Sequence, residues 1–286
     1  MGRGMVDFSF GGKKEMIYNK NFGGLGELVD YCLEHKNSPT AKKFASEWNG
    51  NLSFSDTCRL AVRGWDEGVG KVEKFASGFV DAIGSKLVID EYFYDVTGQD
   101  FDLARVLEGE PECWLNSEQV HVEAPANQTI RLVVNIGASC SVGADTLIRK
   151  GAGVVALVQL LERMRRSVEV VAITRDCYSY NDDKGGGFNF DLTLKHAGQD
   201  LDIGKLAYAL MHPSMLRRLQ FIAMESTWVG MPDSKGYSSN LRQPESDIYI
   251  PASQSYDVID FDSEDNVKLW ILNELVAQGI ELKEGN

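Results

Sequence analysis

The sequence predicts an α/β fold, with a doubly wound, Rossmann-like and mostly parallel sheet that follows a helical N-terminal region. Two observations lead to this prediction. Residues 130–136 (Ile-Arg-Leu-Val-Val-Asn-Ile) form a near-continuous apolar run, which is typical of a central parallel strand covered on both faces. A helical pattern over residues 144–167 follows, and then a second apolar strand over residues 168–174. Strand, helix and strand in this order indicate a right-handed crossover within one sheet.

Residues 1–85 predict a helical region that glycines interrupt. The first clear helix covers residues 25–36 and places four apolar side chains on one face: Leu25, Leu28, Val29 and Cys32. A second helix, which Ser53 or Ser55 can cap, ends near Gly64. A third follows at once, with two acids in its first turn, where the helix dipole favours them.

Residues 86–129 predict a mixed α/β connector. Residues 86–96 are rich in β-formers, and residues 119–124 predict another short strand. Between them lies a short helix that Gly109 and Pro111 close.

The core over residues 130–286 continues with alternating elements. Residues 187–195 alternate apolar and polar side chains, which predicts a half-exposed strand at a sheet edge. A helix over residues 201–212 stops before a proline, and the following segment starts as a helical turn and runs into a strand at residues 219–224. Residues 246–252 predict a strand, and Ser263 caps the last helix, which ends at Gly279.

The bulk composition limits the function classes. The net charge of −13 argues against a nonspecific grip on nucleic acid, which needs clustered Lys and Arg. Five scattered cysteines contain no CxxC pair, which points to a reducing compartment rather than to a disulfide framework. The first residues contain no apolar h-region, so we expect no signal peptide, and no apolar stretch is long enough to span a bilayer. We therefore expect a cytoplasmic protein.

The most suggestive stretch is the turn at the end of the strand over residues 130–136. In doubly wound sheets, ligands bind at the carboxyl ends of the strands. The turn from Gly137 to Gly143 offers two hydroxyls, those of Ser139 and Ser141, and the N-terminus of the next helix. Free N–H groups at a helix N-terminus attract anions or carboxylates, so the turn is a candidate binding site.

The order of these elements resembles a von Willebrand factor A (vWA) domain, which implies a vWA-like core over residues 130–286. The metal-adhesion motif of that family begins Asp-x-Ser-x-Ser at the end of the first strand. Residues 135–139 stand at this place. Asn135 replaces the Asp and Gly137 replaces the first Ser, whereas Ser139 matches the motif.

The resemblance therefore implies a degenerate metal site. The family also takes a Thr from a later loop, but residues 196–205 contain none. It takes an Asp from the end of the fourth strand, where Glu225 is the nearest carboxylate. Mg²⁺ prefers octahedral oxygen ligands with one or two carboxylates, so we expect no cofactor. Ser139, Asn135 and Glu225 are the ligands if Mg²⁺ does bind, provided that residues 219–224 form a strand.

Two further segments are similar to an uncharacterised family of tailed-phage proteins with a vWA-like core. They are residues 94–114 and residues 201–226. This resemblance implies that the protein is phage-encoded and works in the host cytoplasm, but it brings no known activity with it.

Other candidate residues lie in the last third of the chain. His212 is a candidate base, and Arg217 and Arg218 are candidates to clamp a phosphate or a carboxylate of a partner. The alternative is structural: a helix cap followed by surface ion pairs. Trp228 lies in a long loop over residues 226–245 that is expected at the ligand edge of the sheet.

These features favour a non-enzymatic protein–protein interaction module that binds a partner at the carboxyl edge of the sheet. By analogy with other vWA proteins, the partner is an AAA+ ATPase. One alternative is an enzyme that binds a phosphate-bearing ligand through the same turn with Arg217 or Arg218. The other is a self-assembling structural phage protein.

Overall fold

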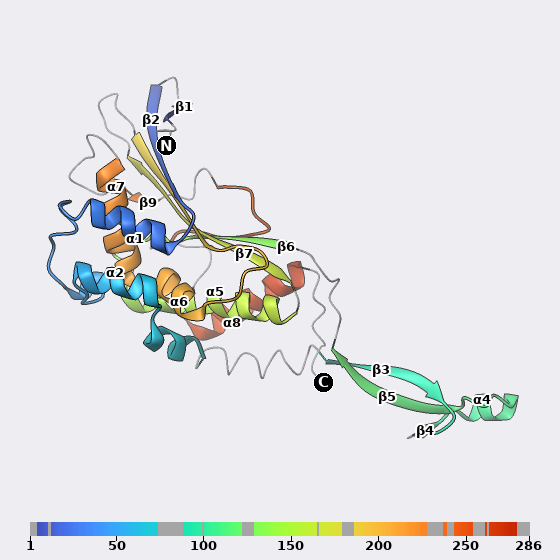
Figure 1. Ribbon diagram of the computed structural model, residues 1–286. Helices are drawn as coiled ribbons and strands as arrows, with labels where there is room; N and C mark the ends of the chain where they lie inside the picture. Colours follow the sequence, from blue (N-terminus) through green and yellow to red (C-terminus); the bar gives the residue numbers. More distant parts are fainter. Residues whose placement is uncertain are drawn as a thin grey trace.

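The computed structural model describes most of the chain (Figure 1). The described residues are 5–10, 13–73, 88–98, 100–121, 129–164, 166–178, 186–227, 237–238, 243–253, 261 and 263–278. In these residues no helix is both long and apolar enough to cross a membrane.

The main sheet has the strand order β1-β2-β8-β7-β6-β10, with β9 paired to β7. Parallel pairs join β2 to β8 and join β6 to both β7 and β10, whereas the other neighbours are antiparallel. The α/β class is therefore confirmed, in a sheet that mixes both kinds of pairing. Its strands are β1 (Met5–Phe10), β2 (Lys13–Phe22), β6 (Thr129–Asn135), β7 (Ser167–Tyr178), β8 (Gly186–Lys195), β9 (Tyr237–Ser238) and β10 (Ile248–Ile250).

The helices begin and end largely where their capping residues predict. Ser53 caps α2 by accepting a hydrogen bond from the backbone N–H of Asp56, and Ser263 caps α8 in the same way. A further helical segment covers residues 66–73. The helices are α1 (Leu25–Glu34), α2 (Phe54–Arg63), α5 (Ala144–Arg163), α6 (Ile203–Met211), α7 (Phe221–Thr227) and α8 (Glu264–Ala277), with a 3₁₀ turn η1 (Glu47–Asn49) and a π-helix η2 (Met215–Gln220).

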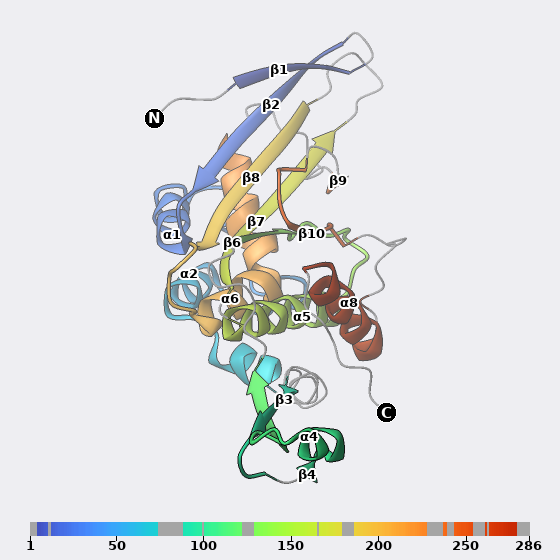
Figure 2. The same ribbon diagram turned by 90° about the vertical axis from the view of Figure 1, so that its right-hand side faces the viewer.

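The helices pack against one face of the sheet (Figures 1 and 2). Buried apolar residues of α1, α2, α5, α6, α7 and α8 join one core with Ile130, Leu132 and Val134 of β6. Val133 points to the opposite face, where the described residues form only a small cluster of strand side chains. A doubly wound sheet has helices on both faces, and the described helices occupy one.

The N-terminal region begins with strands, so the prediction of a helical region is wrong for its first residues. β1 and β2 form an antiparallel hairpin, and β2 pairs in parallel with β8. This pairing also makes β8 an inner strand rather than the predicted edge strand. Phe188, Phe190 and Leu192 of β8 are completely buried in the core.

Residues 88–121 form a separate small sheet with the order β3-β5-β4, which we call the arm. Asp102 caps its helix, and Gly109 ends that helix in a left-handed conformation. The arm projects away from the main sheet in both views (Figures 1 and 2). Its elements are β3 (Val88–Asp95), β4 (Asp100–Phe101), α4 (Leu103–Glu108) and β5 (Trp114–His121).

Candidate functional site

The predicted binding turn after β6 is closed by backbone hydrogen bonds. The Ser139 N–H donates to the Ser253 carbonyl at 2.9 Å, and the Ser253 N–H donates to the Gly137 carbonyl at 2.8 Å. The Asn135 side-chain oxygen accepts from the Gly137 N–H at 3.0 Å. The residue at the Asp position of the resembled motif therefore shapes the turn itself.

A lysine ammonium fills the space between the ends of β6 and β10. Lys150 of α5 is 4% exposed, and its Nζ donates to the Asn135 carbonyl at 3.0 Å and to the Ser253 hydroxyl at 3.2 Å. It also donates to the Pro251 carbonyl. The chain thus places its own cation at the strand ends, where a metal ion would need carboxylates.

The two serines of the turn contact one another. The hydroxyl oxygens of Ser139 and Ser141 are 3.0 Å apart, and Ser141 is exposed. Within the described residues, no group of His, Cys, Asp or Glu is arranged to hold a metal ion.

Glu225 does not lie at the end of a strand, which corrects the predicted ligand set. Residues 219–224 belong to η2 and α7, so the predicted strand over these residues is wrong. A short apolar run fits a buried helix as well as a buried strand, and here it forms a helix. The Glu225 carboxylate accepts from the Thr40 N–H at 2.9 Å and from the Thr40 hydroxyl at 2.5 Å. It thereby ties α7 to the α1–α2 connection.

The two candidate arginines point in different directions from η2, and both are buried. Arg218 is 0% exposed and donates to the carbonyls of Thr40, Lys43 and Phe44. It therefore anchors a loop, which corrects its predicted role as a phosphate clamp. Arg217 donates to the carbonyls of Trp48 and Val142 at 2.7 and 2.9 Å.

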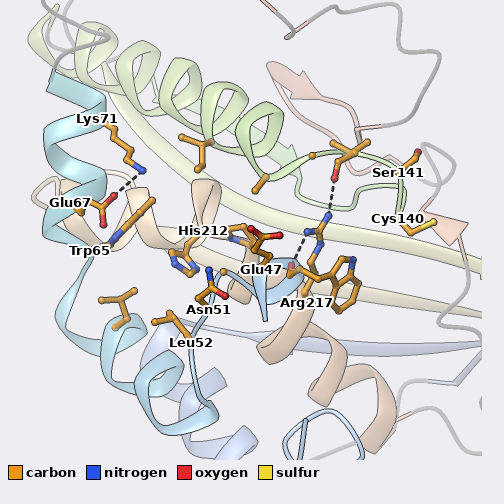
Figure 3. A pocket seen from close by; sticks show the side chains of 18 residues that line it. Glu47, Asn51, Leu52, Trp65, Glu67, Lys71, Cys140, Ser141, His212 and Arg217 are labelled. Carbon is orange, nitrogen blue, oxygen red and sulfur yellow. Dashed lines mark hydrogen bonds and ion pairs between the residues drawn. The ribbon is translucent and has the colours of Figure 1, made fainter. Parts of the chain in front are cut away.

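Arg217 forms part of the wall of a pocket of about 760 Å³ (Figure 3). The pocket lies between the turn that leads into α5, the His212–Arg217 segment and the N-terminal helical region. Arg217 joins two of these walls, since Val142 belongs to the turn and Trp48 to η1. Of the predicted site residues, Ser141, Arg217 and His212 line this pocket, whereas Asn135, Gly137, Ser139, Arg218 and Glu225 do not.

His212 is held as a neutral imidazole in the pocket wall. Its Nδ1 accepts from the Ser214 N–H at 3.2 Å, so the ring proton lies on Nε2, for which the described residues provide no partner. Trp65 packs edge-on against the imidazole with 4.8 Å between the ring centroids, and Tyr208 stacks on it with 5.7 Å between the ring centroids. Burial lowers the pKa of His212 from 6.5 to about 4.

The remaining lining residues give the pocket a mixed character. Lys71 pairs with Glu67 at 2.9 Å and lies over the Trp65 ring at 5.1 Å. Apolar walls come from the loop after η1, from α2 and from α5, through Leu52, Leu60 and Ile148. Opposite charges and apolar surface together suit a ligand with an apolar body and a polar group.

Sequence reasoning missed the contribution of the N-terminal region to this pocket. Gly50 has φ +72°, and a Cβ there would come within 2.5 Å of His212 Cε1, so the loop packs directly on the imidazole. The exposed Cys140 was likewise not predicted as a pocket residue. Trp228 and most of the long loop over residues 226–245, which was expected at the ligand edge of the sheet, lie outside the described residues.

Comparison with known proteins gives one match. The model of a family described as a domain of unknown function, DUF7192, matches residues 11–281. No curated protein and no solved structure matches the chain. Because the match covers most of the sequence, the chain belongs to the DUF7192 family.

Proposed function

We propose that the protein is a non-catalytic interaction module whose pocket receives an apolar side chain of a partner together with an adjacent hydrogen-bond acceptor. The His212 imidazole is the observation that carries this proposal. Its Nε2–H is a donor held in a wall of aromatic and aliphatic side chains. A donor at the side of an apolar pocket fixes the orientation of a ligand that carries a carbonyl or carboxylate oxygen.

The state of His212 favours recognition over proton transfer. A general base works best when its pKa lies near the working pH, whereas the pKa of His212 is about 4. Its Nδ1 contacts Ser214 rather than a carboxylate, so no anion stabilises a protonated ring from that side. An imidazole in this setting remains neutral and donates a hydrogen bond.

The strand order supports a vWA-like core. If the two-residue strand β9, which pairs with β7 off this path, is set aside, then β6, β7, β8 and β10 are the first to the fourth strand of the core, and they lie in the sheet as 3-2-1-4. This matches the first part of the 3-2-1-4-5-6 order of doubly wound sheets. By analogy with vWA adaptors, an AAA+ ATPase is the partner class that we propose, in a phage-encoded setting.

The test uses capped amino acids as minimal partner side chains. Ligand-observed NMR measures the binding of N-acetylphenylalaninamide, N-acetylleucinamide and N-acetyllysinamide to the full chain. We expect saturable binding of the first two at millimolar concentrations and weaker binding of the third. Leu52→Trp fills the pocket and abolishes this binding, whereas Ser139→Ala leaves it unchanged, because Ser139 lies outside the lining.

Phenyl phosphate in the same experiment separates this proposal from a phosphate-binding enzyme. Preferential binding of phenyl phosphate that Leu52→Trp abolishes would favour the enzyme. Failure of all the capped residues to bind, or binding that Leu52→Trp does not change, would refute the pocket as the recognition site.

A further inference from the structure

We propose that the arm of one copy of the protein docks on the loop over residues 36–46 of a second copy, which gives a head-to-tail assembly. We call this loop the basic loop. None of the described residues within 36–46 and 93–117 lines the pocket, so the proposal does not depend on the proposed function.

The basic loop presents an aromatic side chain to solvent from a fixed backbone. Phe44 is 92% exposed, although aromatic side chains gain from burial. The Phe44 carbonyl accepts from both the Arg218 guanidinium and the Asn49 amide at 3.0 Å. Arg218 is fully buried, and Glu225 holds Thr40 in the same loop. A rigid loop loses little conformational entropy when its exposed anchor is buried by a partner.

The charge of the basic loop indicates the chemistry of its partner. Residues 36–46 contain three lysines, Lys36, Lys42 and Lys43, and no acidic residue. All three lysines are exposed. In a protein with a net charge of −13, this is a local positive surface around an apolar anchor. A complementary surface is acidic and apolar.

The arm has these two properties. Residues 93–117 contain six acidic residues and a single basic one, Arg105. The same segment exposes large apolar side chains on β3, β4, α4 and their connections: Phe93, Tyr94, Val96, Phe101, Leu103, Val106 and Leu107. Exposed apolar surface of this kind, rimmed by charges, is typical of an interaction site.

The positions of the two surfaces imply contact between different copies. The α1–α2 connection, which contains the basic loop, and the arm lie at opposite ends of the molecule in Figure 1. The arm of one copy therefore meets the basic loop of the next. An interface between two different surfaces produces rings or open chains rather than a closed symmetric dimer.

Light scattering of the full chain after size-exclusion chromatography tests this proposal over a range of protein concentrations. We expect the mass at low salt to rise with concentration above the 31.7 kDa of one chain. High salt reverses the rise, since exposed charges are screened. Phe44→Ser weakens the association at least tenfold.

Charge reversal provides the specific evidence. Lys42→Glu with Lys43→Glu abolishes the association, and so does Glu108→Lys with Glu110→Lys on the arm. The combination of all four changes restores it. Lys205→Glu with Lys268→Glu is the matched control for the loop variant, because it lowers the net charge of the chain by the same amount and leaves both surfaces intact.

Circular dichroism establishes that each variant is folded. A wild-type chain that remains monomeric at every concentration in low salt would overturn the proposal. An association that the charge reversals on the loop and on the arm leave unchanged would also overturn it. The same holds if the variant with all four substitutions is folded but does not associate.

Discussion

The turn after β6 and the pocket beside it begin from the same stretch of chain but differ in how their polar groups are used. In the turn, backbone groups of Gly137, Ser139 and Ser253 bind one another, and the Lys150 ammonium occupies the gap between the strand ends. In the pocket, the His212 Nε2–H has no partner within the described residues. Small and hydroxyl residues at a strand end can therefore close a turn through their own hydrogen bonds, whereas the recognition site that we propose is the neighbouring pocket.

Among the substitutions that test this comparison, removal of the Lys150 ammonium has the largest expected effect on the free energy of unfolding. Lys150→Met keeps the aliphatic stem and leaves three acceptors without their charged donor. We expect the free energy of unfolding to fall by about 3 kcal/mol. Urea denaturation measures it, with the half-buried Lys205→Met as the control, for which we expect a loss below about 0.5 kcal/mol. An equally small loss for Lys150→Met would mean that the ammonium does not hold the strand ends together.

The pH dependence of stability tests the environment of His212. Its pKa is about 4 in the folded protein and 6.5 in the reference state, so the unfolded chain binds more protons between these pH values. Stability is therefore full above pH 6.5 and falls as the pH drops through this window. From pH 7 to pH 5, His212 contributes a loss of about 2 kcal/mol.

His212→Asn isolates this contribution, since the Asn side-chain oxygen can still accept from the Ser214 N–H. Denaturation of both proteins at pH 7 and pH 5 gives the two slopes. The variant should lose about 2 kcal/mol less than the wild type over this interval. An equal loss of unfolding free energy in both proteins would show that the pKa of His212 is not lowered and that burial does not desolvate the imidazole.

Glu225→Gln has a smaller expected effect and tests the corrected position of this residue. The amide keeps one acceptor for Thr40 and loses the second, so we expect a destabilisation of about 1 kcal/mol. Thermal unfolding with and without 10 mM Mg²⁺ measures it. A stabilisation by Mg²⁺ that the variant loses would return Glu225 to a metal site.

Ser139→Ala has the smallest expected effect. The Ser139 hydroxyl contacts the exposed Ser141, while its backbone N–H makes the bond that closes the turn. We therefore expect a change below about 0.5 kcal/mol in urea denaturation. A loss above about 1.5 kcal/mol would assign the hydroxyl a structural task that its contacts do not explain.

Residues close together in the sequence predicted the helix faces and the helix caps correctly. The apolar faces of α1 and α5 and the caps of α2 and α8 follow from spacing and hydrogen-bonding side chains near them in the chain. The β2 strand was missed because its partner β8 lies about 170 residues further along, and no local pattern encodes that pairing.

The site was predicted in part for the same reason. Ser141, Arg217 and His212 were identified from their chemistry, and all three line the pocket. The other wall comes from the N-terminal region, which only tertiary packing brings to the turn. The short apolar run at residues 219–224 fits either a strand or a buried helix, so the helix that removes Glu225 from the turn was not predictable from it.

Two titrations of one sample compare the turn and the pocket most directly. The protein carries ¹⁵N-labelled histidine, and its imidazole signals are followed by NMR as N-acetylphenylalaninamide or Mg²⁺ is added. We predict that the peptide mimic shifts the His212 Nε2–H signal in a saturable way. We also predict that Mg²⁺, measured in parallel by calorimetry, binds no more tightly than about 1 mM. An unmoved His212 signal, together with tighter Mg²⁺ binding that Ser139→Ala abolishes, would contradict the account and place recognition at the turn.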